Sequence, residues 1–440
     1  MIEQTDKNEV TRVIAVGLRT TEREDEFDHA MEELVSLAEA CDLEVLASMT
    51  QKLDHPDNAT WIGSGKAEEL AEEVKVNDVD HIVCLGNLSP AQMKNLQKII
   101  GVPVWDRTNL ILEIFSRRAK TREARLQVET AYLQYMLPRL SGMWQHLGRQ
   151  SGGGGSRANK GIGEKQIELD RRQISHRITE LKKELAEIEH TRDVQRGGRR
   201  RDGYPHVALV GYTNAGKSTL MNCLLGMGKA SADKTDEKKV FEKDMLFATL
   251  DTSVRKIEPK DHRPFLLTDT VGFISDLPHD LVKAFRSTIE EAKFADLLLE
   301  VIDFSDPEYR HHMEVTQQTL KEIGAGEIPV IYVFNKSDIL QGEQMESGSL
   351  PIEFPRTGAD RVYISAKDKE SLDTLIEVID RKFAEEETEV EMLLPYKEGA
   401  ILGELNGRGL VRSSEYQEDG VLVKALLTAK DISKFGEFII

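Results

Sequence analysis

Short apolar runs alternate with stretches of helical spacing over the first hundred residues. The runs VTRVIAVGL, LEVLASM, DHIVCLG and VPVWD have the length and the β-branched content of buried strands. Between them, residues 27–41, 66–76 and 90–100 repeat apolar side chains at three- and four-residue spacing, which is typical of amphipathic helices. Strands that alternate with helices are typical of a mainly parallel sheet. The pattern therefore predicts a small α/β domain over residues 1–108.

From about Asn109 the pattern becomes purely helical. Two apolar seams with heptad-like spacing follow each other. The first consists of Leu126, Leu133, Leu137 and Leu140, and the second of Ile167, Ile174, Ile178, Leu181, Leu185 and Ile188. Two helices with such seams can pack antiparallel, so we predict a long helical hairpin over residues 109–200.

The connection between these two helices, residues 141–163, is rich in glycine and has no acidic residue. Its aromatic and basic side chains include Trp144, Arg149, Arg157 and Lys160. Glycine-rich connections are usually flexible tethers. Basic side chains beside an aromatic ring are also suited to RNA phosphates and a stacked base. The sequence leaves both interpretations open for this tip loop.

The arginine-rich run at residues 196–201 is expected to form a hinge into the next domain. Strand and helix patterns then alternate again over residues 205–387, starting with the apolar run HVALV, and predict a second α/β domain. Residues 388–440 contain the strand-like runs TEVEMLLP, GLVRSSEYQ and GVLVKALLT around a short helical stretch. We expect a small α+β domain there.

Charge is distributed unevenly along the chain, whose net charge is -19. The helical region, residues 117–201, has 20 Lys and Arg against 10 Asp and Glu, and lies between two acidic regions. A basic element between acidic domains is expected if that element binds a polyanion, although a solvated basic helix pair has the same composition. No apolar stretch approaches the length that spans a bilayer, and the first residues lack a secretory signal. We expect a cytoplasmic protein with no integral membrane association and no DNA partner.

The clearest chemistry lies in GYTNAGKS, which matches the G-x-x-x-x-G-K-[ST] phosphate loop between an apolar strand and a helix. Backbone N–H groups of such a loop surround the phosphates, here those of Gly211, Tyr212, Thr213, Asn214, Ala215 and Gly216. The Lys217 ammonium would neutralise the β- and γ-phosphate oxygens, and the Ser218 hydroxyl would bind Mg²⁺. The motif therefore predicts a site for a nucleoside triphosphate with magnesium.

Three further motifs, each after a predicted strand, indicate GTP. DTVG consists of Asp269, Thr270, Val271 and Gly272, NKSD of Asn335, Lys336, Ser337 and Asp338, and SAK of Ser365, Ala366 and Lys367. Asp269 can hold magnesium through water, and the Gly272 N–H can reach a γ-phosphate. The Asp338 carboxylate can accept two hydrogen bonds from guanine, and SAK can pack around the base. The ligand is expected at the carboxyl edge of a doubly wound sheet.

A GTPase also needs a switch threonine that completes the magnesium shell. The run FATLD supplies Phe247, Ala248, Thr249, Leu250 and Asp251 as further nucleotide-binding candidates. We choose Thr249 as the magnesium ligand beside Ser218, with Thr252 as the competing residue, and name Lys217, Thr249 and Gly272 as the catalytic group.

The residue after DTVG is Phe273, where Ras-like enzymes have a glutamine that orients the attacking water. We therefore expect slow intrinsic hydrolysis that needs a partner or another device.

These motifs, together with the preceding hairpin and its IGEKQIELDRRQI run, resemble the HflX family, translational GTPases of the Obg–HflX group. The resemblance covers essentially the whole chain. It implies GTP hydrolysis stimulated by the large ribosomal subunit, and contacts to rRNA and ribosomal proteins through the amino-terminal α/β domain and the hairpin. It also implies a role in splitting or rescuing stalled ribosomes or in subunit biogenesis.

We expect a protein that is monomeric when free. In potassium-stimulated GTPases similar to this one, an asparagine at the position of Asn214 helps to bind K⁺; a hydrogen bond that stabilises the loop is the alternative role. Two other functions stay open from the residues: a Ras-type signalling switch with protein effectors, and a P-loop kinase or ATPase.

Overall fold

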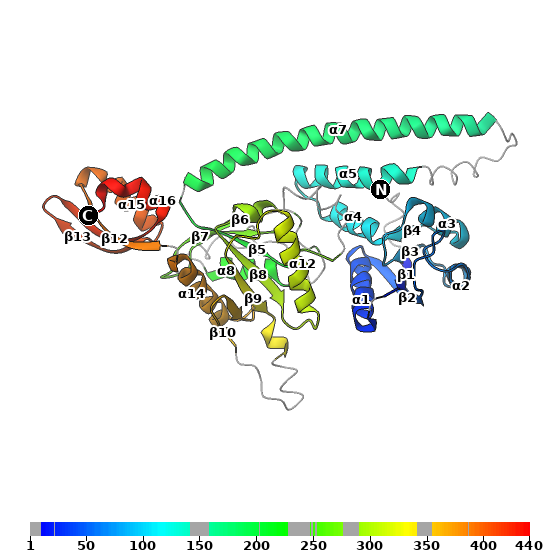
Figure 1. Cartoon of the computed structure of the whole chain (residues 1–440), viewed down its shortest axis with the longest axis horizontal. Helices are drawn as coiled ribbons and strands as arrows, with labels where there is room; N and C mark the ends of the chain where they lie inside the picture. Colours follow the sequence, from blue (N-terminus) through cyan, green and yellow to red (C-terminus); the bar gives the residue numbers. More distant parts are fainter. Residues whose placement is uncertain are drawn as a thin grey trace, which may run out of the picture. The chain divides into compact units, whose positions relative to one another are not determined.

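The computed structural model divides into two compact units (Figure 1). The first unit holds residues 1–191, 245–250 and 276–285, and the second holds residues 192–244, 251–275 and 286–440. The residues that the structure describes are 10–21, 23–140, 158–201, 203–227, 247, 250, 253–275, 290–340, 354–385 and 387–440.

The first unit begins with the predicted α/β domain, whose four strands are all parallel. In the order β2-β1-β3-β4 the strands are β2 (Leu43–Lys52), β1 (Thr11–Arg19), β3 (His81–Cys84) and β4 (Val104–Asp106). The helices are α1 (Glu24–Ala40), α2 (Ser64–Asn77), α3 (Pro90–Ile100) and α4 (Arg107–Arg118). Right-handed crossovers place α1 on one face of the sheet and α2 and α3 on the other, and α2 packs against α3 while α1 packs against α4. The prediction of a parallel α/β domain is confirmed.

The hairpin is formed by α5 (Arg122–Met136), the short η1 (Leu137–Arg139) and α7 (Ala158–Arg201). Two ion pairs show that its helices run antiparallel. Arg122 at the start of α5 pairs with Glu184 at 2.8 Å, whereas Glu129, later in α5, pairs with Arg177, earlier in α7, at 2.9 Å. Figure 1 shows α5 beside α7. Of the predicted seam, Leu181 is 0% exposed. The antiparallel hairpin is therefore confirmed, and burial of its apolar seam supports it.

Three details of the hairpin differ from the prediction. The helical stretch from Asn109 is broken, because α4 ends at the extended Ala119 and the Thr121 hydroxyl caps a new helix by accepting from the Ala124 N–H at 3.1 Å. Helix α7 begins at Ala158, so the last six residues of the predicted tip loop are helical. It also continues to Arg201 through two glycines, where a hinge was predicted. Glycine costs a helix only about 1 kcal/mol relative to alanine, which is too little to end a helix of 44 residues. The remainder of the tip, residues 141–157, lies outside the described residues.

The second unit contains a seven-stranded sheet in the order β10-β11-β9-β8-β5-β7-β6. Its central strands are parallel, and β6 and β10 are antiparallel edges. The strands are β5 (His206–Val210), β6 (Ser253–Ile257), β7 (Phe265–Asp269), β8 (Leu297–Asp303), β9 (Val330–Asn335), β10 (Arg356–Thr357) and β11 (Arg361–Tyr363). The helical segments are α8 (Lys217–Met227), η2 (Glu290–Phe294), α12 (Tyr309–Glu322) and α14 (Lys369–Glu385). This doubly wound sheet confirms the predicted P-loop fold.

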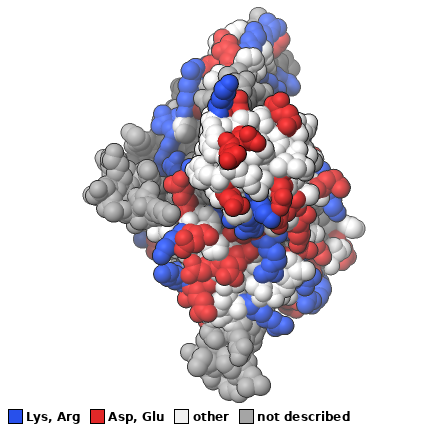
Figure 2. Space-filling model, turned by 90° about the vertical axis from the view of Figure 1, so that its left-hand side faces the viewer, with Lys and Arg blue, Asp and Glu red and all other residues white. Residues whose placement is uncertain are grey.

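The unit ends in a three-stranded antiparallel sheet with its own core. The strands are β12 (Glu387–Leu394), β14 (Gly420–Thr428) and β13 (Val411–Gln417), and the helical segments are η3 (Tyr396–Glu398), α15 (Gly399–Gly407), α16 (Ala429–Phe435) and η4 (Gly436–Phe438). Arg408 donates two hydrogen bonds to Asp431, at 2.9 and 3.0 Å, and so joins the end of α15 to α16. The α+β arrangement is as predicted. Acidic and basic side chains are interspersed on the face of the molecule shown in Figure 2. Among the described helices, none is both long and apolar enough to cross a membrane.

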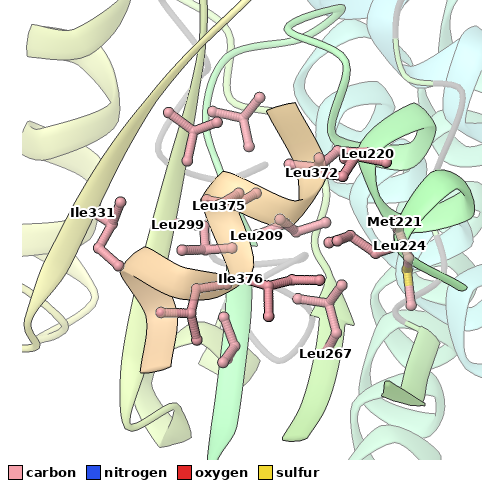
Figure 3. Close-up of a cluster of buried hydrophobic side chains, with 14 of the residues drawn as sticks. Leu209, Leu220, Met221, Leu224, Leu267, Leu299, Ile331, Leu372, Leu375 and Ile376 are labelled. Atoms are coloured by element: carbon pink, nitrogen blue, oxygen red, sulfur yellow. The ribbon is translucent and has the colours of Figure 1, made fainter. Parts of the chain in front are cut away.

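The core that supports the nucleotide-site loops lies between the seven-stranded sheet and two helices (Figure 3). Helix α14 places Leu372, Leu375 and Ile376 on one face at helical spacing, all less than 5% exposed. They pack with α8 and with strand residues such as Leu209 and Leu299. Burying one such side chain stabilises the fold by about 1.5–3 kcal/mol. The strand ends that carry the loops are thus fixed by apolar packing beneath them.

One charged side chain interrupts the apolar strand β8. Glu300 is 1% exposed, and among the described residues its carboxylate has only the Gln317 side chain beside it, without a hydrogen bond of good geometry. Burial raises the pKa of this carboxyl to about 8. In the folded state the group therefore keeps its proton at a pH where the unfolded chain has already lost it.

We predict that the free energy of unfolding falls as pH rises from about 5 to about 8, because the folded state binds more protons than the unfolded state over this range. Replacing Glu300→Gln should remove most of this slope and raise stability at the alkaline end. Chemical denaturation across the pH range measures it, with Glu314→Gln, exposed on α12, as the matched control. An unchanged slope in Glu300→Gln would show that other groups cause the pH dependence.

Candidate nucleotide site

The phosphate loop connects the end of β5 to the start of α8 through two glycines with positive φ. Gly211 has φ 140°, and a Cβ there would lie 2.2 Å from the Val301 carbonyl oxygen. Gly216 has φ 92°, and a Cβ there would lie 2.3 Å from the Asn335 amide nitrogen. Only glycine fits these approaches. Between them, Asn214 is exposed with φ 60°, and its side chain makes no hydrogen bond to another described residue.

Lys217 points back under this loop from the first turn of α8. Its ammonium donates to the carbonyl oxygens of Gly211 at 3.0 Å and Tyr212 at 2.6 Å. Burial lowers the pKa of this lysine to about 8, and the nearby Asp269 carboxylate offsets part of that effect. The loop thus holds a buried ammonium at the position where the motif requires one.

Ser218, Asp269 and Gly272 lie together beside this lysine. The Ser218 hydroxyl donates to the Asp269 carboxylate at 2.7 Å, which joins α8 to the end of β7. A Cβ on Gly272 would lie 3.1 Å from the Lys217 nitrogen and 2.9 Å from the Thr213 Cα, so this backbone runs directly against the phosphate loop. A hydroxyl and a carboxylate side by side are oxygen ligands of the kind that Mg²⁺ prefers, so the residues present fit this ion.

NKSD, the motif expected to read guanine, is joined to the phosphate loop by Asn335. Its side-chain amide donates to the Ala215 carbonyl at 2.9 Å and accepts from the Ala366 N–H at 2.9 Å. Lys336, with φ 61°, donates to Asp303 at 2.7 Å. The next acidic side chain, Asp338, is exposed. The structure therefore brings NKSD, SAK and the phosphate loop to one edge of the sheet.

The other predicted site residues are placed as follows. Thr270 donates through its hydroxyl to the Leu209 carbonyl at 2.6 Å. Val271, Ser337 and Ser365 are buried, and Lys367 is exposed.

Only part of the predicted switch is described. Phe247 and Leu250 are buried within the first unit, where the Phe247 ring meets Phe115 edge-on with centroids 4.7 Å apart. Ala248, Thr249, Asp251 and the competitor Thr252 lie outside the described residues.

Sequence reasoning missed several side chains around the loop. Tyr212 was given only a backbone role, yet its ring stacks on His312 of α12 with centroids 3.8 Å apart. Phe273 is buried and pairs with the loop, donating from its N–H to the Gly211 carbonyl at 3.1 Å. Helix α12 contains no recognisable motif, and the only signal in the sequence was two adjacent histidines on a helix beside the site.

Comparison with known proteins agrees with this geometry. Residues 28–116 match the family described as GTP-binding GTPase N-terminal, residues 118–199 match GTP-binding GTPase Middle Region, and residues 206–336 match 50S ribosome-binding GTPase. The GTPase HflX of Caldanaerobacter subterraneus is 42% identical over 98% of this chain and 94% of its own length. The chain belongs to the HflX family of GTPases.

Other HflX proteins are similar along nearly the whole chain. The GTPase HflX of Chlamydia pneumoniae is 41% identical over 93% of this chain and 84% of its own length. Among solved structures, a GTP-binding protein from Sulfolobus solfataricus in complex with GDP is 25% identical, with 84% of this chain and 97% of that chain covered and a TM-score of 0.42. Membership of the HflX family includes the hairpin as well as the nucleotide-binding domain, and gives no support to a Ras-type switch.

We predict that Asp338→Asn changes the base preference of this HflX protein from guanine to xanthine. An amide cannot accept both hydrogen bonds from guanine, and such charge-assisted bonds are worth about 1.5–3 kcal/mol, so GDP affinity should fall about 10- to 100-fold. XDP affinity should rise. Titration with fluorescent nucleotides measures both, with Asp373→Asn, exposed on α14, as the control. Unchanged GDP affinity in Asp338→Asn would contradict the role given to NKSD.

Proposed function

We propose that this protein is a ribosome-associated factor that binds the large ribosomal subunit and hydrolyses GTP in splitting or rescuing stalled ribosomes or in subunit biogenesis. The observation that carries the proposal is the match of residues 206–336 to a family described as 50S ribosome-binding GTPase, within relatives aligned over the whole chain. The basic hairpin gives the chain an element suited to RNA phosphates.

The proposed hydrolysis uses the groups gathered at the carboxyl edge of the sheet. The Lys217 ammonium exchanges its two carbonyl acceptors for β- and γ-phosphate oxygens and neutralises charge that develops there. The Gly272 backbone lies beside the Lys217 nitrogen, and its N–H would orient the γ-phosphate. Ser218, with Thr249, would hold Mg²⁺, and Asp269 would support it through water; the ion supplies charge neutralisation between the phosphates when bound.

Water positioning needs a group other than the residue after DTVG. Phe273 is buried and its backbone is paired to the phosphate loop, so it supplies neither a donor nor an acceptor at the γ-phosphate. Asn214 is the exposed polar side chain of the loop, and its amide oxygen makes no bond to another described residue. An amide oxygen in that position fits a monovalent cation, which would add positive charge beside the phosphates.

We predict that GTP hydrolysis is faster in potassium than in sodium buffer of equal ionic strength, and that Asn214→Ala removes the difference. The two ions carry the same charge, so a general salt effect predicts equal rates. Phosphate release under single-turnover conditions measures it. Equal rates of GTP hydrolysis in both buffers for the unchanged protein would contradict the proposal that Asn214 binds a potassium ion.

The hairpin is the proposed ribosome contact. Along α7 the exposed side chains include Arg171, Arg172, Lys182 and Lys183. The described parts of the chain show acidic and basic side chains interspersed on the face in Figure 2, so that face offers no uniformly basic surface to RNA. The excess positive charge of residues 117–201 therefore favours the hairpin as the RNA-binding element.

We predict that the protein sediments with purified 50S subunits in a sucrose gradient when a non-hydrolysable GTP analogue is bound. Replacing Arg149, Arg157 and Lys160 by alanine should weaken this binding. The slope of log affinity against log salt concentration should also fall by about one for each lost phosphate contact. The control replaces Lys260, Lys397 and Arg412, which are exposed in the second unit, and changes the net charge equally. Equal loss in both variants would indicate nonspecific attraction, and absence of any cosedimentation would refute the ribosome role.

A further inference from the structure

Tyr212, the second residue of the phosphate loop, links three elements through its side chain. Its ring lies parallel to that of His312 on α12, with centroids 3.8 Å apart and 12° between the planes. Its hydroxyl accepts from the Ser275 N–H at 2.9 Å and lies 2.9 Å from the Ser275 hydroxyl. The same serine hydroxyl is 3.3 Å from Nε2 of His311. One ring therefore joins the loop, helix α12 and the backbone that follows DTVG.

This backbone is also attached to the loop by main-chain hydrogen bonds. The Thr213 N–H donates to the Phe273 carbonyl at 2.8 Å, and the Phe273 N–H donates to the Gly211 carbonyl at 3.1 Å. Gly272, whose N–H is assigned to the γ-phosphate in the proposed hydrolysis, directly precedes Phe273, and Ser275 directly follows Ile274. The backbone at Gly272 is thus held against the phosphate loop at two points. Phe273, the next residue, pairs with the loop backbone, and Ser275, three residues after Gly272, bonds to the Tyr212 hydroxyl.

The chemistry of the stack suits a rigid support. Tyr212 is 7% exposed, and the Tyr212 carbonyl oxygen accepts from the Lys217 ammonium at 2.6 Å. Burial lowers the pKa of His312, against the raising effect of Asp306, whose carboxylate is 3.8 Å from the ring. The two rings stack nearly parallel, and an aromatic pair contributes about 0.5–1.5 kcal/mol beyond its burial, which favours one orientation of both rings. Any shift of Tyr212 would move two acceptors together: its carbonyl oxygen, which accepts from Lys217, and its hydroxyl, which accepts from the Ser275 N–H.

We propose that Tyr212 and His312 are positioning residues for GTP hydrolysis: their stacked rings hold Ser275, and through it the Gly272 backbone, against the phosphate loop. This inference rests on the proposed hydrolysis. It assigns the pair a function in the chemical step, where the alignment of Gly272 matters, and not in the affinity for nucleotide, which the loop N–H groups supply.

The test compares single-turnover hydrolysis with nucleotide affinity in four variants. Tyr212→Phe removes both bonds to Ser275 and should lower the hydrolysis rate about tenfold, with KM for GTP and Kd for GDP changed by less than about twofold. Ser275→Ala keeps its N–H and should cause a smaller loss. His312→Ala removes the stack and should resemble Tyr212→Phe, whereas His312→Phe keeps a flat ring and should restore most of the rate.

Glu314→Ala, exposed on the same helix, is the matched control and should hydrolyse at the rate of the unchanged protein. Thermal unfolding of each variant reports whether the fold is retained. The inference is overturned if Tyr212→Phe and His312→Ala hydrolyse normally, if KM changes as much as the rate, or if His312→Phe is as slow as His312→Ala. Failure of the unchanged protein to hydrolyse GTP would refute the proposed function instead, so the two failures are distinguishable.

Discussion

One buried amide holds the nucleotide site together. Asn335 donates to the carbonyl of Ala215 in the phosphate loop and accepts from the N–H of Ala366 in the loop after β11, so two loops far apart in sequence are fixed to the end of β9. Because a buried amide that loses a partner costs about 1–3 kcal/mol, the loops can separate only at a substantial energetic cost. The Asn335 amide also explains why position 216 is a glycine, because any larger residue would displace the amide. The phosphate loop and the loops expected to read the base thus share one structural support.

Most of this site could be predicted from the sequence because its chemistry is local. A phosphate loop needs glycines, a lysine and a hydroxyl at fixed spacing, and the strand before it and the helix after it can be read from apolar periodicity. The order of DTVG, NKSD and SAK after successive strands then places them on one edge of a parallel sheet. The structure contains that sheet, and it adds what Asn335 does, since a bond between residues 335 and 215 has no signature in the sequence.

What the sequence could not show depends on contacts across long separations or on cooperativity. Tyr212 and His312 are 100 positions apart, and nothing in their neighbourhoods marks them as a stacked pair. The length of α7 is another example, because local glycine propensity predicts a break at residues 197–198, whereas hydrogen bonding along the rest of the helix continues through them. Glu300 is a third: a single acid in a β-strand pattern does not reveal that its carboxyl is fully enclosed.

The two helices of the hairpin are joined by surface ion pairs and by buried apolar contacts, and ionic strength affects these two kinds of contact differently. Its ion pairs, Arg122 with Glu184 and Arg177 with Glu129, lie at the surface with their side chains at least partly exposed. Such pairs contribute only about 0–1 kcal/mol and weaken by screening. The buried contacts of Leu181 and Ile178 are apolar and are not weakened by salt. Raising ionic strength should therefore dissociate a bound polyanion while the two helices remain packed against each other. In the proposed function, salt would displace RNA from the surface of this hairpin and leave the folding of the hairpin intact.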